Sequence, residues 1–180
     1  GSNEIVQEIA VSDDVSEITQ GGGEYAYAIC RSSNSVDVFD RNARVKQIFL
    51  PGEPQSISWN GAFKRGKRRI AVTCRVPDER RGLLCVIDEE TLEICNTMQI
   101  GALPSGICLD QHRKLFFVAN FGEDSVHIVN QSGNRVFHSV ATAGRPTIAN
   151  YSWADQDQII VSLEAGGVLQ RLDASRLPPE

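Results

Sequence analysis

The residues with the most obvious chemistry form a run of cations, Lys64-Arg-Gly-Lys-Arg-Arg69, in which five of the six residues are positively charged. Clustered cations bind phosphates, RNA or acidic peptides, because neutralising a polyanion releases its counterions. Stacking on bases would need aromatic side chains as well, and Phe63 is the only one next to the run. One hypothesis is therefore RNA binding, and the competing interpretation is a solvated loop. The residues concerned are Lys64, Arg65, Lys67, Arg68 and Arg69.

A second group of arginines occupies recurring positions. Arg31 and Arg75 each follow a cysteine at the end of an apolar stretch, and Phe121 and Glu164 take the corresponding places further along the chain. Arginine and aromatic side chains supply many of the strongest contacts in protein interfaces. We therefore predict a surface that docks a peptide with acidic and apolar anchors, while salt bridges to nearby acidic residues are the alternative role. The predicted surface consists of Arg31, Arg75, Arg80, Arg81, Phe121 and Arg145.

Catalytic patterns are absent from the sequence. The three histidines, His112, His127 and His138, do not have the spacing of metal ligands. There is no Gly-x-Ser-x-Gly motif, and Gly21-Gly22-Gly23 lacks the helix and lysine that follow in a phosphate-binding loop. We therefore expect no enzyme activity, no metal and no cofactor.

The elements that must position these residues are short strands. Between Lys114 and Ser152, four apolar runs rich in β-branched and aromatic residues are separated by Gly, Asn, Asp, Ser and Pro. Runs of this kind at intervals of roughly 8–12 residues are typical of all-β proteins. The pattern recurs about every 42–50 residues, which is the period of four-stranded propeller blades. A polar residue closes one run in each copy, at Asp40, Asp88, Asn130 and Asp173.

The third copy carries a family resemblance. The segments Phe117-Val-Ala-Asn-Phe-Gly-Glu-Asp-Ser-Val-His-Ile-Val129 and Leu103-Pro-Ser-Gly-Ile-Cys-Leu-Asp110 resemble the YVTN/NHL-type β-propeller repeat. The resemblance extends over almost the whole chain but is weaker outside this copy. It implies a ring of blades that serves mainly as an interaction surface. Members of the family include RNA-binding and protein-binding domains and lactonase-like enzymes, and the fold does not choose among them.

The repeat predicts about four blades. A helical interpretation of residues 88–94 and 159–177 conflicts with this repeat. The expected strands are 15–19, 25–31, 35–40 and 44–50; 55–59, 69–75, 83–88 and 92–100; 105–110, 115–120, 125–130 and 135–142; and 147–153, 158–163 and 168–173. The last blade lacks a strand, and residues 3–11 resemble the last strand of a repeat. We predict that this N-terminal strand pairs beside residues 168–173 and closes the ring, which would remove two exposed sheet edges. The alternatives are an eight-bladed dimer or a ring shared with another chain.

Composition limits the remaining possibilities. The 180 residues predict a single domain over 3–175, with a cloning remnant at 1–2 and a tail at 176–180. A net charge of −5 argues against general attraction to nucleic acid. No apolar run approaches the roughly 18 residues of a membrane span. The five cysteines form no CxxC pair, and their odd number does not suit a disulfide framework, so we expect a reducing compartment, cytoplasmic or nuclear.

Together these observations predict a non-catalytic β-propeller interaction module, or scaffold, that docks a protein or peptide partner through its loop face, either alone or within a larger protein or complex. The first alternative is an NHL-like RNA-binding propeller that uses residues 64–69. The second is a lactonase-like enzyme, which would need metal-binding side chains around the channel.

Overall fold

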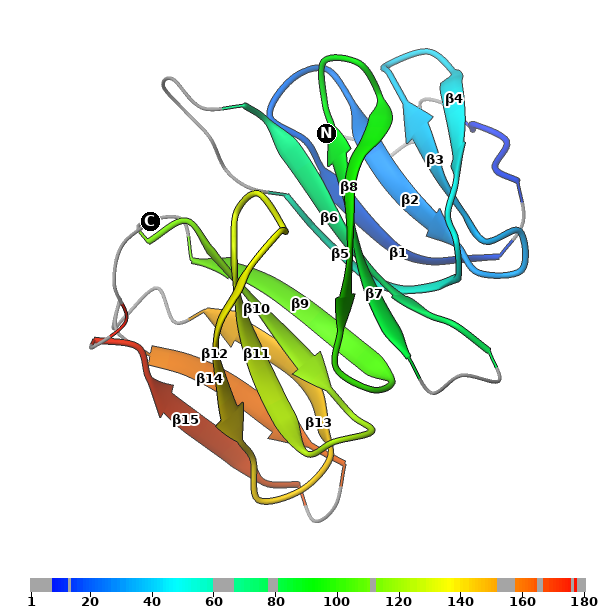
Figure 1. The fold of residues 1–180 in the computed structure, drawn as a ribbon. Coiled ribbons are helices and arrows are strands. Elements are labelled where there is room, and N and C mark those ends of the chain that lie inside the picture. The colour runs from blue at the N-terminus through cyan, green and yellow to red at the C-terminus, as the bar shows by residue number, and fades with distance from the viewer. Residues whose placement is uncertain are drawn as a thin grey trace, which may run out of the picture.

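The computed structural model describes residues 8–12, 14–59, 67–77, 81–110, 113–151, 158–164, 167–175 and 177. Within these ranges the chain folds into four antiparallel sheets and contains no helix, so none of the described elements could cross a membrane as a helix (Figure 1). The first sheet contains β1 (Val15–Gln20), β2 (Ala26–Cys30), β3 (Ser35–Phe39) and β4 (Arg44–Phe49). The second contains β5 (Glu53–Trp59), β6 (Arg69–Arg75), β7 (Gly82–Asp88) and β8 (Glu93–Ile100). The third contains β9 (Pro104–Asp110), β10 (Leu115–Asn120), β11 (Ser125–Asn130) and β12 (Val136–Ala141). The fourth contains β13 (Pro146–Tyr151), β14 (Gln158–Leu163) and β15 (Leu169–Asp173).

The all-β prediction and the order of strands within each sheet are confirmed, and the helical interpretation of residues 88–94 is excluded. Asp88 instead starts a turn: its Oδ1 accepts the backbone N–H groups of Glu90 and Thr91 at 2.9 and 3.2 Å. Asp40 binds the N–H groups of Asn42 and Ala43 in the same way. A short polar side chain that satisfies the backbone two and three residues on is a standard way to form a turn. This is the physical reason why a polar residue closes the third strand of each repeat.

The core consists of three apolar layers, each between two successive sheets. Phe116 and Phe117 are consecutive on β10 and both are at most 1% exposed. Because neighbouring side chains on a strand point to opposite faces, Phe116 packs in the layer toward the second sheet with Leu84, and Phe117 packs in the layer toward the fourth with Ile159. A third layer, with Tyr27 and Ile70 among its members, joins the first two sheets.

The four sheets follow one another in chain order as an arc. β1 packs beside β5, β5 beside β9, and β9 beside β13, so the first strand of each sheet lies on the inside of the arc (Figure 1). The described residues of β1 and β13 have no comparably extensive contact, and no hydrogen-bonded strand pair joins the first sheet to the fourth. In the described part of the chain, no hydrogen-bonded strand pair therefore closes the arc.

The predicted closure by residues 3–11 is consequently not found. Residues 3–7 lie outside the described ranges, residues 8–11 form no strand, and the fourth sheet has three strands where the chain is described. Ser12 binds the first sheet instead: its N–H and hydroxyl donate to the two carboxylate oxygens of Asp37 at 2.7 and 2.8 Å. The Asp37 side chain is fully buried, and a buried carboxylate needs such donors. These hydrogen bonds hold Ser12 on the first sheet.

Candidate functional site in the axial groove

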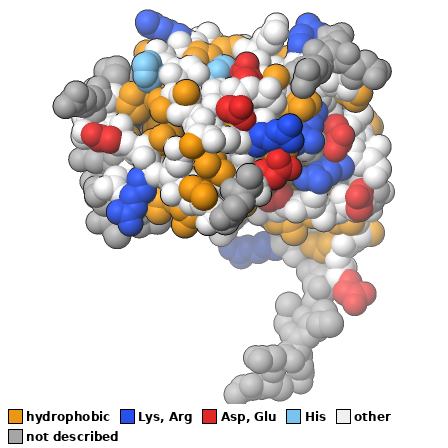
Figure 2. All heavy atoms as spheres, turned by 90° about the horizontal axis from the view of Figure 1, so that it is seen from below, with side chains coloured by type: hydrophobic (Ala, Val, Ile, Leu, Met, Phe, Trp, Pro, Cys, Tyr) orange, Lys and Arg blue, Asp and Glu red, His pale blue; other side chains and the backbone are white. Residues whose placement is uncertain are grey.

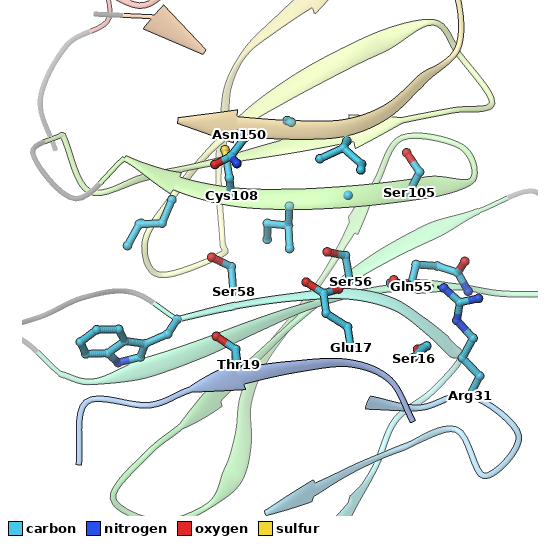
Figure 3. A pocket seen from close by; sticks show the side chains of 16 residues that line it. Ser16, Glu17, Thr19, Arg31, Gln55, Ser56, Ser58, Ser105, Cys108 and Asn150 are labelled. Atoms are coloured by element: carbon cyan, nitrogen blue, oxygen red, sulfur yellow. Dashed lines mark hydrogen bonds between the residues drawn. The ribbon is translucent and has the colours of Figure 1, made fainter. Parts of the chain in front are cut away.

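A groove runs along the inner strands of the four sheets. It encloses about 570 Å³ and is lined by residues of β1, β5, β9 and β13. Ligand sites in proteins are typically about 300–1,000 Å³. Figure 3 shows two groups of side chains at its two ends: Ser16, Arg31, Gln55 and Ser105 at one end, and Thr19, Ser58, Cys108 and Asn150 at the other. The inside of the arc is therefore a polar, concave surface of ligand size.

Glu17 of β1 is the central charged group of the groove. Its Oε2 accepts the backbone N–H of Ile57 on β5 at 3.2 Å, so the carboxylate joins the first and second sheets. Burial raises the pKa of Glu17 above its usual value, although the hydrogen bonds from Ser56 and Ile57 and the charge of Arg31 act in the opposite direction. The groove therefore holds a carboxyl group that is easier to protonate than an exposed glutamate.

Several polar side chains of the groove are available to a ligand. Ser16, Thr19, Ser58 and Asn150 make no side-chain hydrogen bond to another described residue, and none of the four is fully buried. Ser105 differs, because its hydroxyl contacts the carbonyl oxygens of Ala119 and Pro146. The lining also has an apolar part, which consists of Trp59, Ile107, Leu109 and Ile148. Such a lining can hydrogen-bond a ligand and bury a hydrophobic group at the same time.

Two of the predicted binding arginines join successive sheets. Arg31 lies directly after β2 and is exposed; its Nη2 points at the carbonyl oxygen of Gln55 on β5, at 3.5 Å. Arg75, the last residue of β6, donates from Nε to the carbonyl oxygen of Pro104 on β9 at 3.3 Å. Burial lowers the pKa of Arg75. The recurrence of arginine at this position therefore has a structural cause, and Arg31 alone of the two lines the groove.

Phe121 and Arg145 contact each other, as a shared binding surface requires. The Arg145 guanidinium lies 5.1 Å from the centre of the Phe121 ring, and its Nη1 is 3.3 Å from Glu164 Oε2. Arg81 is exposed, and Arg80 lies outside the described residues. Figure 2 views the molecule from the side on which the turns between second and third strands lie in Figure 1, and it shows basic, acidic and hydrophobic side chains next to one another. Partner binding at these residues stays a prediction.

The basic run is divided by the structure. Lys64 and Arg65 lie outside the described residues, Lys67 is exposed, and Arg68 and Arg69 are half-buried. Arg68 turns inward, with its Nε 3.8 Å from Oε2 of Glu89, whose side chain is 1% exposed. Because Arg68 belongs to an internal ion pair, fewer cations of the run than predicted are available to a polyanion. RNA binding also stays a prediction.

Gly21, Gly22 and Gly23 form the turn above Glu89. Oε1 of Glu89 accepts the Gly22 N–H at 2.9 Å, and a methyl group on Gly21 would overlap this oxygen. The hydroxyl of Tyr27 lies buried in the same place, and burial followed by the charge of Glu89 raises the pKa of Tyr27. The three glycines therefore allow close approach to a buried carboxylate, a role that their sequence did not reveal.

The remaining candidates for chemistry are dispersed. In the described ranges no three His, Cys, Asp or Glu side chains gather as a metal site would require. His127 is 3.5 Å from Glu123, and burial lowers the pKa of His127. Cys95 is exposed, whereas the other four cysteines are buried, and Cys74 and Cys85 approach within 4.0 Å between their sulfurs as free thiols.

Comparison with known proteins identifies the fold. No protein-family model matches the chain, and no curated protein is significantly similar. Among solved structures, the dihydro-heme d1 dehydrogenase NirN in complex with DHE has a TM-score of 0.72 at 19% identity, over 96% of this chain and 38% of that one. The hydrazine synthase of Kuenenia stuttgartiensis has a TM-score of 0.56 at 14% identity, over 93% of this chain and 74% of that one. The fold is β-propeller-like. The chain spans 38% of the length of the dehydrogenase it resembles.

This comparison corrects one sequence prediction. The chain was expected not to be an enzyme, yet the similar structures include a dehydrogenase, so this arrangement of sheets occurs in enzymes. The lack of short catalytic motifs is therefore a poor guide for this fold, because motifs such as Gly-x-Ser-x-Gly belong to other architectures. The YVTN/NHL assignment has no matching family model and stays a resemblance.

The sequence did not single out the groove residues. Ser16, Ser58, Ser105 and Asn150 are ordinary polar residues, and they are separated by about 40–50 positions, the spacing of the repeat. The available signal was that all four lie in the first strand of a repeat, Ser16 and Ser105 as its second residue and Ser58 and Asn150 further along. A search for polar residues in the first strand of each repeat would have found them.

Proposed function

We propose that the chain is a binding module whose axial groove takes an extended peptide segment of a protein partner, and that this segment carries an acidic group and an apolar side chain. One observation carries the proposal: a groove of about 570 Å³ presents polar side chains that bond no other described side chain or backbone group, beside an exposed arginine and an apolar wall. Extended peptides offer backbone N–H and C=O groups at regular intervals, and hydroxyl and amide side chains can pair with both.

The arrangement of charges favours an acidic ligand group at one end. Arg31 is exposed at the mouth, and its long contact with the Gln55 carbonyl oxygen leaves most guanidinium N–H groups available. Guanidinium groups bind carboxylates through two parallel hydrogen bonds. Glu17 is occupied by Ser56 and Ile57, so its charge is partly neutralised by hydrogen bonds within the protein.

The apolar wall supplies the second anchor. Ile148 on β13 is 60% exposed, and Trp59 on β5 is half-buried at the same groove. Each of these partly exposed apolar side chains loses unfavourable contact with water when a leucine or phenylalanine side chain covers it. A peptide that places an acidic side chain at Arg31 and an apolar side chain at this wall would use both features.

Fluorescence anisotropy with labelled synthetic peptides tests the proposal. The probes are short extended peptides with an aspartate near one end and leucine or phenylalanine at alternate positions, and the controls replace the aspartate with lysine. We expect the acidic peptides to bind and Arg31→Gln to weaken them roughly tenfold, as the loss of one charged hydrogen bond of about 1.5 kcal/mol requires. Ser58→Leu should block the groove, and Arg41→Gln, on an exposed turn outside the groove, should have no effect. Equal binding of acidic and basic peptides, or unchanged affinity in Arg31→Gln, would refute the proposal.

A further inference from the structure

Glu17 and Arg31 are the two charged side chains among the described residues that line the axial groove. Figure 3 shows both of them pointing from the first sheet into the groove, Glu17 toward Ser56 and Arg31 toward Gln55. Burial raises the pKa of Glu17, and the nearby charge of Arg31 is one of the influences that lower it. An acidic ligand group that binds Arg31 therefore also comes close to the carboxyl group of Glu17.

The ionised form of Glu17 opposes such a ligand. When Glu17 is ionised, its charge balances that of Arg31, and a ligand carboxylate leaves one negative charge unbalanced. When Glu17 is protonated, the ligand carboxylate and Arg31 balance each other. Two carboxyl groups that share one site favour the state in which one of them carries a proton. Binding of the acidic group therefore favours the protonated form of Glu17.

The groove accommodates both forms of Glu17. Its Oε2 accepts the Ile57 N–H at 3.2 Å, and a carboxyl oxygen remains an acceptor in either form. The Ser56 hydroxyl also hydrogen-bonds Glu17. It can donate to a carboxylate and accept from a carboxylic acid, because a hydroxyl does both. Protonation therefore changes the charge of the groove without removing these hydrogen bonds.

Other groups around Glu17 also carry a charge or could take one. They are Asp14 just before β1, Tyr27 on β2, Arg31 just after β2, Glu53 on β5 and Cys108 on β9 across the groove. Burial raises the pKa of both Tyr27 and Cys108, so both remain protonated at neutral and mildly acidic pH. Asp14 and Glu53 are carboxyl groups like Glu17, and their variants therefore provide the matched controls.

We propose that Glu17 takes up one proton from solution when the acidic group of a peptide binds Arg31, so that the groove binds acidic peptides more tightly in mild acid than at neutral pH. This inference rests on the proposed function, because it concerns the same peptide in the same groove. The proton adds to the Glu17 carboxylate and returns to the solution when the peptide dissociates. By linkage, the uptake of one proton raises the affinity by up to about tenfold for each unit by which the pH falls.

Anisotropy titrations between about pH 5 and pH 8 test the proposal, above the ordinary aspartate pKa of about 3.9. The probes are the acidic peptides with blocked ends and no other titratable residue, and a second set has cysteic acid in place of aspartate, because its sulfonate stays ionised throughout. We expect wild type to bind both sets more tightly as the pH falls, by about three- to tenfold per unit where the change is steepest. Glu17→Gln should bind with an affinity that does not depend on pH. Glu53→Gln and Asp14→Asn should keep the wild-type response.

Isothermal titration calorimetry in buffers of different ionisation enthalpy counts the protons directly and needs no variant. The uptake by wild type should equal the slope of the logarithm of its affinity against pH, and Glu17→Gln should take up none. Circular dichroism checks that each variant keeps its β-structure.

The outcomes separate this inference from the proposed function. Acidic peptides that bind wild type equally at every pH, or without proton uptake, would overturn the inference and leave the proposed function standing. A wild-type pH response in Glu17→Gln would overturn it as well, and so would the loss of that response in Glu53→Gln or Asp14→Asn. Acidic peptides that bind at no pH would refute the proposed function, and the inference with it.

Discussion

Glu89 connects the first and second sheets, and its replacement measures how much this connection stabilises the fold. The residue directly follows β7 of the second sheet, and its carboxylate accepts the N–H of Gly22 from the β1–β2 turn of the first sheet. The second oxygen is 3.8 Å from Arg68 Nε. We consider Glu89→Leu, which keeps the volume and removes both interactions, and Glu89→Gln, which keeps an acceptor for Gly22.

The magnitudes differ between the two variants. Glu89→Leu leaves the Gly22 N–H without its acceptor, which costs about 1–3 kcal/mol. The ion pair adds only about 0–1 kcal/mol, because Arg68 is 37% exposed and solvent screens its charge. We therefore expect a loss of about 1–4 kcal/mol, equivalent to a drop in Tm of about 2–16 °C for a chain of this length. Glu89→Gln should lose less than about 1 kcal/mol, because its amide oxygen accepts from Gly22 and its amide N–H can donate to the Tyr27 hydroxyl.

Urea denaturation followed by tryptophan fluorescence and a thermal melt give these values, and Glu90→Leu is the control. Glu90 is adjacent in sequence but exposed, so its replacement should change the free energy of unfolding by no more than about 0.5 kcal/mol. The reasoning is refuted if Glu89→Leu is as stable as the wild type, or if Glu89→Leu and Glu90→Leu lose the same amount.

Three further predictions concern single groups. Burial raises the pKa of Glu17 in the folded protein, so folding favours its protonated form. The contribution of Glu17 to stability is therefore lost as the pH rises above the ordinary glutamate range. Relative to wild type, Glu17→Gln should gain stability between acidic and neutral pH, as urea titrations at several pH values will show. Burial lowers the pKa of His127, so its contribution to the stability of the folded protein is present above the usual histidine pKa of 6.5 and is lost as the pH falls. His127→Gln should therefore unfold less readily than wild type in mild acid. An identical acid transition in the two proteins would contradict this prediction. With a thiol reagent, the native protein should show one fast-reacting cysteine, the exposed Cys95, and all five cysteines should react in denaturant. A second fast-reacting thiol in the native protein would contradict the burial of the other four.

Much of the fold follows from local patterns in the sequence. Asp40, Asp88, Asn130 and Asp173 mark the ends of third strands because each side chain binds backbone N–H groups within a few residues, an interaction that needs no other part of the molecule. The continuous apolar run of β10 similarly indicates a strand buried on both faces, and β10 lies between two layers of the core.

The role of the repeated arginine could not be derived locally. Arg31 and Arg75 occupy the same repeat position, and sequence alone made both of them binding residues. In the structure, each of these arginines contacts a carbonyl oxygen of the next sheet, and only Arg31 of the two lines the groove. The candidate site depended on tertiary structure for the same reason, since Ser16, Ser58, Ser105 and Asn150 are brought together only when four sheets pack side by side.

The sequence by itself determined where strands begin and end, because those positions depend on turns and on alternation over a few residues. Whether the ends of the arc meet, and which polar side chains share the groove, was decided only by tertiary structure. These features depend on the angle at which one sheet packs on the next, and the large apolar side chains between the sheets set that angle together. The anchor of Ser12 on the buried Asp37 illustrates the difference, because it joins residues 25 positions apart, which no pattern over a few residues predicts.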